Sequence, residues 1–220
     1  MIEAVVFDLD GVIVDSEQVW DDVRERYTRE SGGTYTDSAA RDMMGMSSVE
    51  WSRYMAERLG VPGTPAEINA AIVERMLERY GEAPPLIPGA ADAVRRCAER
   101  WPLAVASSSN PELIEVVLER AGIRGLFLAV VSSQDVPRGK PAPDVYLDAS
   151  RRLRVEPERG AAVEDSHNGI RSAKAAGMRV VVVPNVHFPP DAGALGLADT
   201  VVRSVGELTP GLIESLGSAR

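Results

Sequence analysis

The stretch VVFDLDGVIVDSE, residues 5–17, places two carboxylates directly behind an apolar run. Residues 4–8 have the length and composition of a buried parallel strand. Asp8 and Asp10 follow two residues apart, so in an extended segment their side chains point the same way. Two carboxylates about 4 Å apart repel by about 1 to 4 kcal/mol. Keeping both in one place therefore requires protonation or a cation.

Short apolar segments that predict further parallel strands recur in the later sequence, at 103–107, 128–133, 161–165 and 179–184. Helical patterns lie around and between them, at 89–100, 110–121, 142–154 and 166–176. This alternation is typical of an α/β fold, and we expect a Rossmann-like, doubly wound parallel sheet. The tail, with 199–208 and a short helix, is expected to add an edge element.

The spacing between the first two strands breaks this alternation, because only helical patterns fill it. They cover 16–30, 37–44, 48–59 and 65–80. The Pro- and Gly-rich segment 81–89 then leads back to the strand pattern. We therefore expect a catalytic core formed by 1–15 and 82–220, with a helical domain of about four helices, 16–81, inserted after the first strand.

The composition restricts the partners of the chain. The net charge is −9, and an acidic chain without Lys/Arg runs is a poor candidate for binding nucleic acid. Cys97 is the single cysteine, so no intramolecular disulfide is expected. The sequence has neither a signal-peptide pattern nor an apolar run long enough to span a membrane. We expect a cytoplasmic protein without a membrane partner, a monomer or a weak homodimer.

Polar residues collect where the predicted strands end, and in an open parallel sheet ligands bind there. The first strand ends at Asp8 and Asp10, the second at Ser107, and the fourth at Glu164 and Asp165. Oxygen ligands with open positions suit Mg²⁺, which often bridges carboxylates to a substrate phosphate. These residues predict phosphoryl transfer in which one aspartate attacks phosphorus and the other handles the proton.

Four motifs in order carry a resemblance to a known family. DLDGV, VASSS, GKPAPD and VEDSHNGIRSAKAAGM occur at successive strand ends. The chain resembles the haloacid dehalogenase superfamily of phosphatases over nearly its whole length. The resemblance is to the branch with a helical cap inserted after strand one, which includes β-phosphoglucomutase-like and phosphoglycolate phosphatase-like proteins.

The resemblance implies roles for the acids. Asp8 is the nucleophile and a magnesium ligand. Asp10 is the general acid/base, and its backbone carbonyl also contacts the metal. Asp165 is a metal ligand, and Glu164 beside it belongs to the expected metal-binding set. The cofactor expected from this set is Mg²⁺.

The resemblance also implies a phosphate-binding site. Ser107 binds the transferring phosphoryl group, and Lys140 stabilises its negative charge. Leu9 and Ser108 complete the expected phosphate-binding set. The expected function is Mg²⁺-dependent hydrolysis of a small phosphorylated metabolite, with sugar phosphates as the expected class.

Two other functions stay open, namely a phosphomutase of the β-phosphoglucomutase type and a binding or regulatory protein, and a halide-releasing dehalogenase is weaker than both. The regulatory alternative is disfavoured because no catalytic position is missing, and a dehalogenase would have no use for Asp10. Against a mutase, the first inserted helix contains no histidine, and Ser47, Ser48 and Asn110 stand where basic residues are expected.

Other segments have less specific patterns. We expect 15–22 to be a hinge and a solvated helix face, and His167 to be an exposed residue at a helix start. His187, in the loop after the last buried strand, and the turn at 45–46 are candidates for approaching the substrate.

Overall fold

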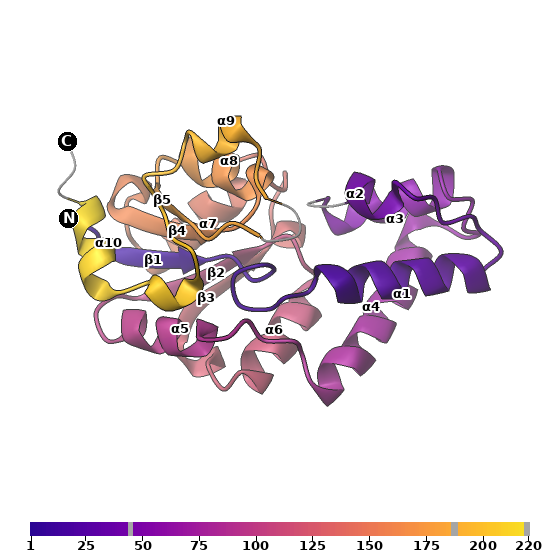
Figure 1. Cartoon of the computed structure of the whole chain (residues 1–220), viewed down its shortest axis with the longest axis horizontal. Coiled ribbons are helices and arrows are strands. Elements are labelled where there is room, and N and C mark those ends of the chain that lie inside the picture. The colour runs from indigo at the N-terminus through magenta and orange to yellow at the C-terminus, as the bar shows by residue number, and fades with distance from the viewer. Residues whose placement is uncertain (44–45, 186–188, 218–220) are drawn as a thin grey trace.

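The computed structural model describes residues 1–43, 46–185 and 189–217. Within them, six parallel strands form one sheet in the order β3-β2-β1-β4-β5-β6 (Figure 1). The strands are β1 Ala4–Phe7, β2 Leu103–Ser107, β3 Phe127–Ser132, β4 Gly160–Glu164, β5 Arg179–Val182 and β6 Thr200–Val201. The predicted α/β sheet is confirmed, and the tail supplies its edge strand β6, as expected.

Helices cover both faces of the sheet because alternate side chains of β1 point to opposite sides. Val5 and Phe7 belong to one buried cluster, and Ala4 and Val6 belong to the other. The first cluster includes residues of α5 (Ala90–Ala98), α6 (Pro111–Arg120) and α10 (Pro210–Leu216). The second includes residues of α7 (Asp144–Leu153), α8 (His167–Ala175) and α9 (Ala192–Leu195). Short 3-10 turns complete the connections: η1 Arg124–Leu126, η2 Ser133–Asp135, η3 Pro157–Arg159 and η4 Val205–Glu207.

Four helices lie between β1 and α5 in the sequence, beside the sheet in Figure 1. They are α1 Glu17–Glu30, α2 Ala39–Met43, α3 Ser48–Glu57 and α4 Pro65–Glu82. Thr64 caps α4 through a capping box with Glu67, and Pro65 occupies the first helical position, where its missing N–H costs nothing. Below, we call α1 to α4 and their connections the helical segment.

The chain enters and leaves the helical segment through two connecting segments that lie side by side. Val14 and Leu86 form an antiparallel bridge. Asp15 N–H donates to the Pro85 carbonyl at 2.8 Å, and Ile87 N–H donates to the Ile13 carbonyl at 2.9 Å. The two backbone connections between the sheet and the helical segment therefore lie next to each other.

In the described ranges, no helix is both long enough and apolar enough to cross a membrane.

Candidate active site

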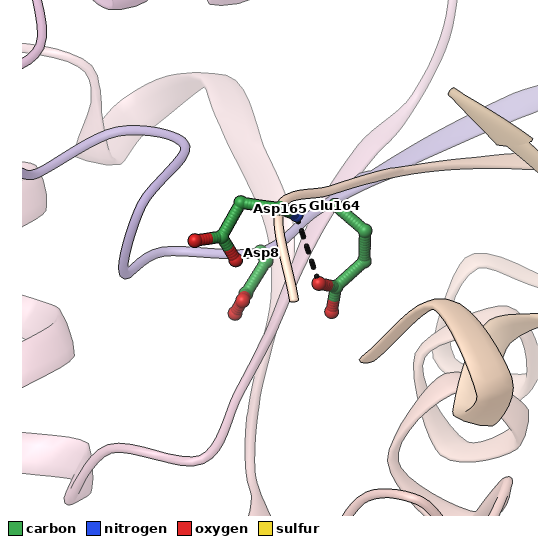
Figure 2. A group of neighbouring side chains, drawn as sticks. All are labelled: Asp8, Glu164 and Asp165. Atoms are coloured by element: carbon green, nitrogen blue, oxygen red, sulfur yellow. Dashed lines mark hydrogen bonds between the residues drawn. The ribbon is translucent and has the colours of Figure 1, made fainter. Parts of the chain in front are cut away.

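An acidic cluster lies where the adjacent strands β1 and β4 end. Asp8, Glu164 and Asp165 each contribute a carboxylate oxygen, and these oxygens all lie within 4.8 Å of one another (Figure 2). The parallel register pairs Phe7 with Val163, so the residues that follow emerge together. All three side chains are buried, which concentrates negative charge in a region shielded from water.

Lys140 supplies a positive charge to this cluster. Its Nζ lies 3.0 Å from an Asp8 oxygen and 2.6 Å from a Glu164 oxygen. Burial alone would lower the pKa of Lys140, but the carboxylates of Asp8 and Glu164 raise it overall. The lysine is therefore a permanent cation beside Asp8 at neutral pH.

One lysine does not balance three buried carboxylates. Burial, followed by the charge of Glu164, raises the pKa of Asp8 and of Asp165 well above the ordinary range. A divalent cation would remove this electrostatic cost, and an all-oxygen set of donors fits a hard ion such as Mg²⁺. The donors present therefore fit the expected cofactor.

Gly11 allows the β1 loop to approach the cluster closely. Its φ is +75°, and a Cβ atom there would lie 1.8 Å from an Asp165 oxygen. Both the left-handed backbone and the lack of space require glycine at this point. The glycine of the DLDGV motif thus lets the loop after β1 and the end of β4 share one site.

Glu164 is fully engaged by neighbouring donors. One oxygen accepts from Lys140 and, at 2.7 Å, from the Tyr146 hydroxyl. The other accepts from the N–H groups of Asp165 and Ser166 at 3.1 and 3.2 Å. These contacts suit a residue that holds Lys140 in place. The metal-binding role expected for Glu164 stays a prediction.

The Asp10 side chain accepts hydrogen bonds from hydroxyl groups and from the helical segment. One oxygen accepts from the Ser16 hydroxyl and from Trp20 Nε1, and the latter distance is 3.4 Å. The other accepts from the Ser109 hydroxyl at 2.7 Å and from the Ser107 hydroxyl at 3.4 Å. Asp10 does not belong to the group of three clustered acids, but it lines the cavity that contains Asp8 as well as the cavity that extends to the helical segment. This position suits a group that exchanges protons with a leaving group.

The expected phosphate-binding residues lie near Asp8 and Asp10, and each makes a different contact there. The Leu9 side chain is buried, but its N–H donates to an Asp8 oxygen at 2.7 Å. The Ser107 hydroxyl is buried and accepts from Ser109 N–H at 3.0 Å. Ser108 lines the cavities beside Asp10. The structure therefore brings all of these residues to one end of the sheet.

Two adjacent cavities share Asp10, Glu17 and Ser108 in their walls. The core-side cavity is completed by Asp8, Lys140, Asp165, Ser166, His167, Asn168 and Asn185. The helix-side cavity is completed by Trp20, Arg24, Met43, Met46, Trp51 and Ser109. A ligand that reaches from Asp8 into the helical segment would lie against these shared residues.

The prediction that 15–22 forms a solvated helix face is wrong for most of the segment, in which only Asp15 and Gln18 are exposed. Trp20 is buried, and Glu17 is half-buried in the wall of both cavities. Burial and the charge of Asp10 raise the pKa of Glu17 to about 7. Sequence reasoning also missed Arg24. The spacing of 17, 20 and 24 places these three residues on one face of a helix, and this signal could have revealed them.

The less specific expectations have mixed outcomes. His167 is the first residue of α8, as expected, but it is half-buried and lines the core-side cavity. Met46 lines the helix-side cavity. His187 and Gly45 lie outside the described residues.

Comparisons with known proteins agree with the motifs. A family model described as "haloacid dehalogenase-like hydrolase" matches residues 2–177. Hexitol phosphatase B of Escherichia coli (strain K12) is 33% identical, over 94% of this chain and 95% of that protein. The crystal structure of CbbY from Rhodobacter sphaeroides in complex with phosphate has a TM-score of 0.86 at 29% identity, covering 97% of this chain and 100% of that one. A putative β-phosphoglucomutase from Thermotoga maritima has a TM-score of 0.73 at 30% identity, covering 97% and 99%.

Proposed function

Because this chain belongs to the haloacid dehalogenase-like hydrolase family, we propose that it is a Mg²⁺-dependent phosphatase working through an aspartyl-phosphate intermediate. As an enzyme it is a phosphoric monoester hydrolase. The single observation that carries the mechanism is the placement of Asp8, paired with Lys140 at 3.0 Å, inside a cluster of acids that calls for a cation.

Asp8 and Asp165, with the backbone carbonyl of Asp10, would hold the ion. When bound, Mg²⁺ would neutralise charge on the phosphate and on the acids. Asp8 then attacks phosphorus while the bond to the leaving oxygen breaks, and Asp10 donates a proton to that oxygen. In the second half, Asp10 takes a proton from the water that attacks the aspartyl phosphate, which regenerates Asp8 and releases inorganic phosphate. Lys140 balances the negative charge of the transferring group.

We assign residues 1–15 and 82–220 to the catalytic core and 16–81 to a cap. Closure of the cap over Asp8 would exclude bulk water during the first half of the reaction, and opening would admit the hydrolytic water. The cap would also contact the leaving group. A sugar phosphate or a related polyol phosphate is the proposed substrate class, supported by the similarity to hexitol phosphatase B. A monomer or weak homodimer in the cytoplasm is part of the same proposal.

A phosphate-release screen over phosphorylated metabolites, with and without Mg²⁺, tests the function. Wild-type protein should release phosphate from a subset of the panel, and only with a divalent cation present. Asp8→Asn should stay folded and release none, because an amide does not act as the nucleophile. Turnover by Asp8→Asn at the wild-type rate would show that another residue attacks phosphorus.

A phosphomutase is the second candidate, and two observations favour it. One is the similarity to the putative β-phosphoglucomutase. The other is Arg24, a cation in the helix-side cavity, which weakens the argument that the helical segment lacks basic groups. Incubation with β-glucose 1-phosphate, Mg²⁺ and a trace of the 1,6-bisphosphate separates the two functions. We expect inorganic phosphate with little glucose 6-phosphate, whereas fast glucose 6-phosphate formation without phosphate release would establish the mutase.

A further inference from the structure

Arg24 is a buried cation without an ion-pair partner among the described residues. Its side chain is 7% exposed, and its Nε has no hydrogen-bond partner. Glu17, Asp10 and Asp21 influence its charge, but no carboxylate of the described chain lies within ion-pair distance of it. A buried charge without hydrogen-bonded partners costs free energy, so an arginine in this position calls for a ligand.

Two tryptophan rings hold the guanidinium group. Arg24 Cζ lies 4.6 Å from the centre of the Trp20 ring and 4.9 Å from that of Trp51. The two rings are themselves 5.9 Å apart, and they come from α1 and α3. Cation–π contacts stabilise the charge, but they do not use the N–H donors of the guanidinium group. The rings therefore fix the group and leave its donors available.

The cavity that Arg24 lines adjoins the proposed reacting centre. Arg24, Trp20 and Trp51 line the helix-side cavity together with Asp10. That cavity shares Asp10, Glu17 and Ser108 with the core-side cavity, which contains Asp8 and Lys140. A substrate whose phosphate meets Asp8 would thus place its leaving group towards Arg24.

We propose that Arg24 binds an oxyanion carried by the leaving group of the substrate, either a carboxylate or a second phosphate. The inference rests on the proposed phosphatase function, since the leaving group is defined by attack of Asp8. A planar guanidinium group binds such oxyanions through two parallel hydrogen bonds, which a single neutral hydroxyl does not reproduce. Arg24 is then a specificity-determining residue that selects phosphomonoesters with a second negative charge.

Matched substrates test this selection. One pair is 3-phosphoglycerate and glycerol 3-phosphate, which differ by a carboxylate in place of a neutral hydroxymethyl group. The other is fructose 1,6-bisphosphate and fructose 6-phosphate, which differ by a second phosphate. Wild type should favour the charged member of at least one pair. Arg24→Met should lower kcat/KM for that member about 10- to 100-fold, mainly through KM, as expected for loss of hydrogen bonds to a charged group. The pair that responds identifies the oxyanion.

Two further variants define the effect. Arg24→Lys keeps the charge without the planar donors and should recover part of the loss. Arg26→Met removes an exposed arginine of the same helix and should leave both substrates unaffected. Thermal unfolding of each variant reports folding. An equal loss of kcat for the charged and the neutral member would mean that Arg24 only supports the packing of α1 and α3, and would overturn the proposal.

A binding measurement separates this inference from the proposed function. Trp20 and Trp51 contact Arg24, whereas Trp101, the remaining tryptophan, donates to the Ile2 carbonyl. In Asp8→Asn, 3-phosphoglycerate or fructose 1,6-bisphosphate should therefore change tryptophan fluorescence at lower concentration than its neutral counterpart. Arg24→Met in that background should abolish the difference. Equal titrations for both members would refute the selection by Arg24, whether or not the wild-type protein releases phosphate.

Discussion

Asp165 illustrates how much of the chemistry depends on single side chains. Its carboxylate lies in the acidic cluster, and Asn185 donates to it at 3.3 Å. Burial and the negative charges of Glu164 and Asp8 raise the pKa of Asp165. A residue in this environment is better suited to hold a cation than to form a surface ion pair.

Asp165→Ala should raise the Mg²⁺ concentration needed for half-maximal phosphate release by about ten-fold or more, because an oxygen ligand is lost. The measurement is activity against Mg²⁺ concentration after removal of bound metal with a chelator. Asp191→Ala, which removes an acid paired with Arg171 away from the cluster, is the control and should leave the Mg²⁺ dependence unchanged. An unaltered Mg²⁺ dependence in Asp165→Ala would exclude this residue as a ligand.

Glu17 should make the stability depend on pH. Burial raises its pKa from 4.5 to about 7, so between these values the folded protein holds a proton that the unfolded chain releases. Stability then falls as the pH rises through this range, and the cost is complete above it. Glu17→Gln removes the cost, which has an upper bound of about 3 kcal/mol.

The difference in Tm between Glu17→Gln and wild type should therefore grow from pH 5 to pH 8 by several degrees, in favour of the variant. Glu30→Gln, at the exposed end of the same helix, controls for the loss of one acidic charge. A constant difference across this range, or one that shrinks with pH, would contradict the raised pKa.

Among single residues, the sequence predicted the site residues at the sheet better than those of the helical segment. Asp8, Lys140 and Asp165 belong to motifs at strand ends, and parallel strands bring such ends together in any fold of this class. Arg24 does not follow a strand, so the topology of the sheet does not determine its position. The spacing along α1 places Arg24 on the same helix face as Trp20, but its contact with Trp51 of α3 joins two distant parts of the sequence and is not encoded in that local pattern.

Among the elements, the start of α8 is fixed by a close approach to β4. Glu164, the last residue of β4, lies against Gly169 in the first turn of α8, and a Cβ at Gly169 would lie 1.8 Å from a Glu164 oxygen. The Ser166 hydroxyl accepts from Gly169 N–H at 3.1 Å and caps the helix. Strand and helix therefore fit together only with glycine at this position.

Gly169→Ala should displace Glu164 and, through it, Lys140. We expect a loss of about 1–3 kcal/mol in unfolding free energy, typical of overpacking, together with a marked loss of phosphate release. Gly81→Ala is the matched change in α4, where an added Cβ meets nothing within 4 Å. It should be neutral, or stabilising by up to about 1 kcal/mol, because alanine favours helix. Denaturant unfolding and phosphate release measure both variants, and full activity in Gly169→Ala would show that Glu164 tolerates movement.

The elements themselves were largely predictable. Apolar runs of strand length fixed β1 to β5, because strands buried on both faces need continuous hydrophobic sequence. The observed strand boundaries differ slightly from the predicted ones. β1 ends at Phe7 and not at Asp8, so the nucleophile proposed here lies in the loop and not in the strand. The exact residue at which a strand ends depends on local hydrogen bonds, and the hydrophobic pattern of the sequence does not describe these bonds.

For the whole molecule, alternation of strands and helices predicted the sheet, but not the order β3-β2-β1-β4-β5-β6. The long stretch of sequence between the first two strands, filled with helical patterns, predicted the helical segment. Its placement over the site was not predictable from periodicity, because it is fixed by contacts between distant residues. Gln134 Nε2, for example, donates to the Ser48 hydroxyl at 2.8 Å across the two parts.

The central position of β1 has a consequence for synthesis of the protein. β1 leaves the ribosome before the other strands of the sheet, and its two neighbours begin only at Leu103 and Gly160. The helical segment can form early, whereas β1 stays unpaired on one edge until β4 has emerged. Ribosome-bound chains arrested before β4 should therefore be cleaved by protease in the β1 region, and chains arrested beyond α8 should resist it. Early protection of β1 would show that β2 alone suffices. Since Asp8 meets Glu164 and Asp165 only at that late stage, a chain terminated before β4 would retain Asp8 but lack the two acids that complete the cluster.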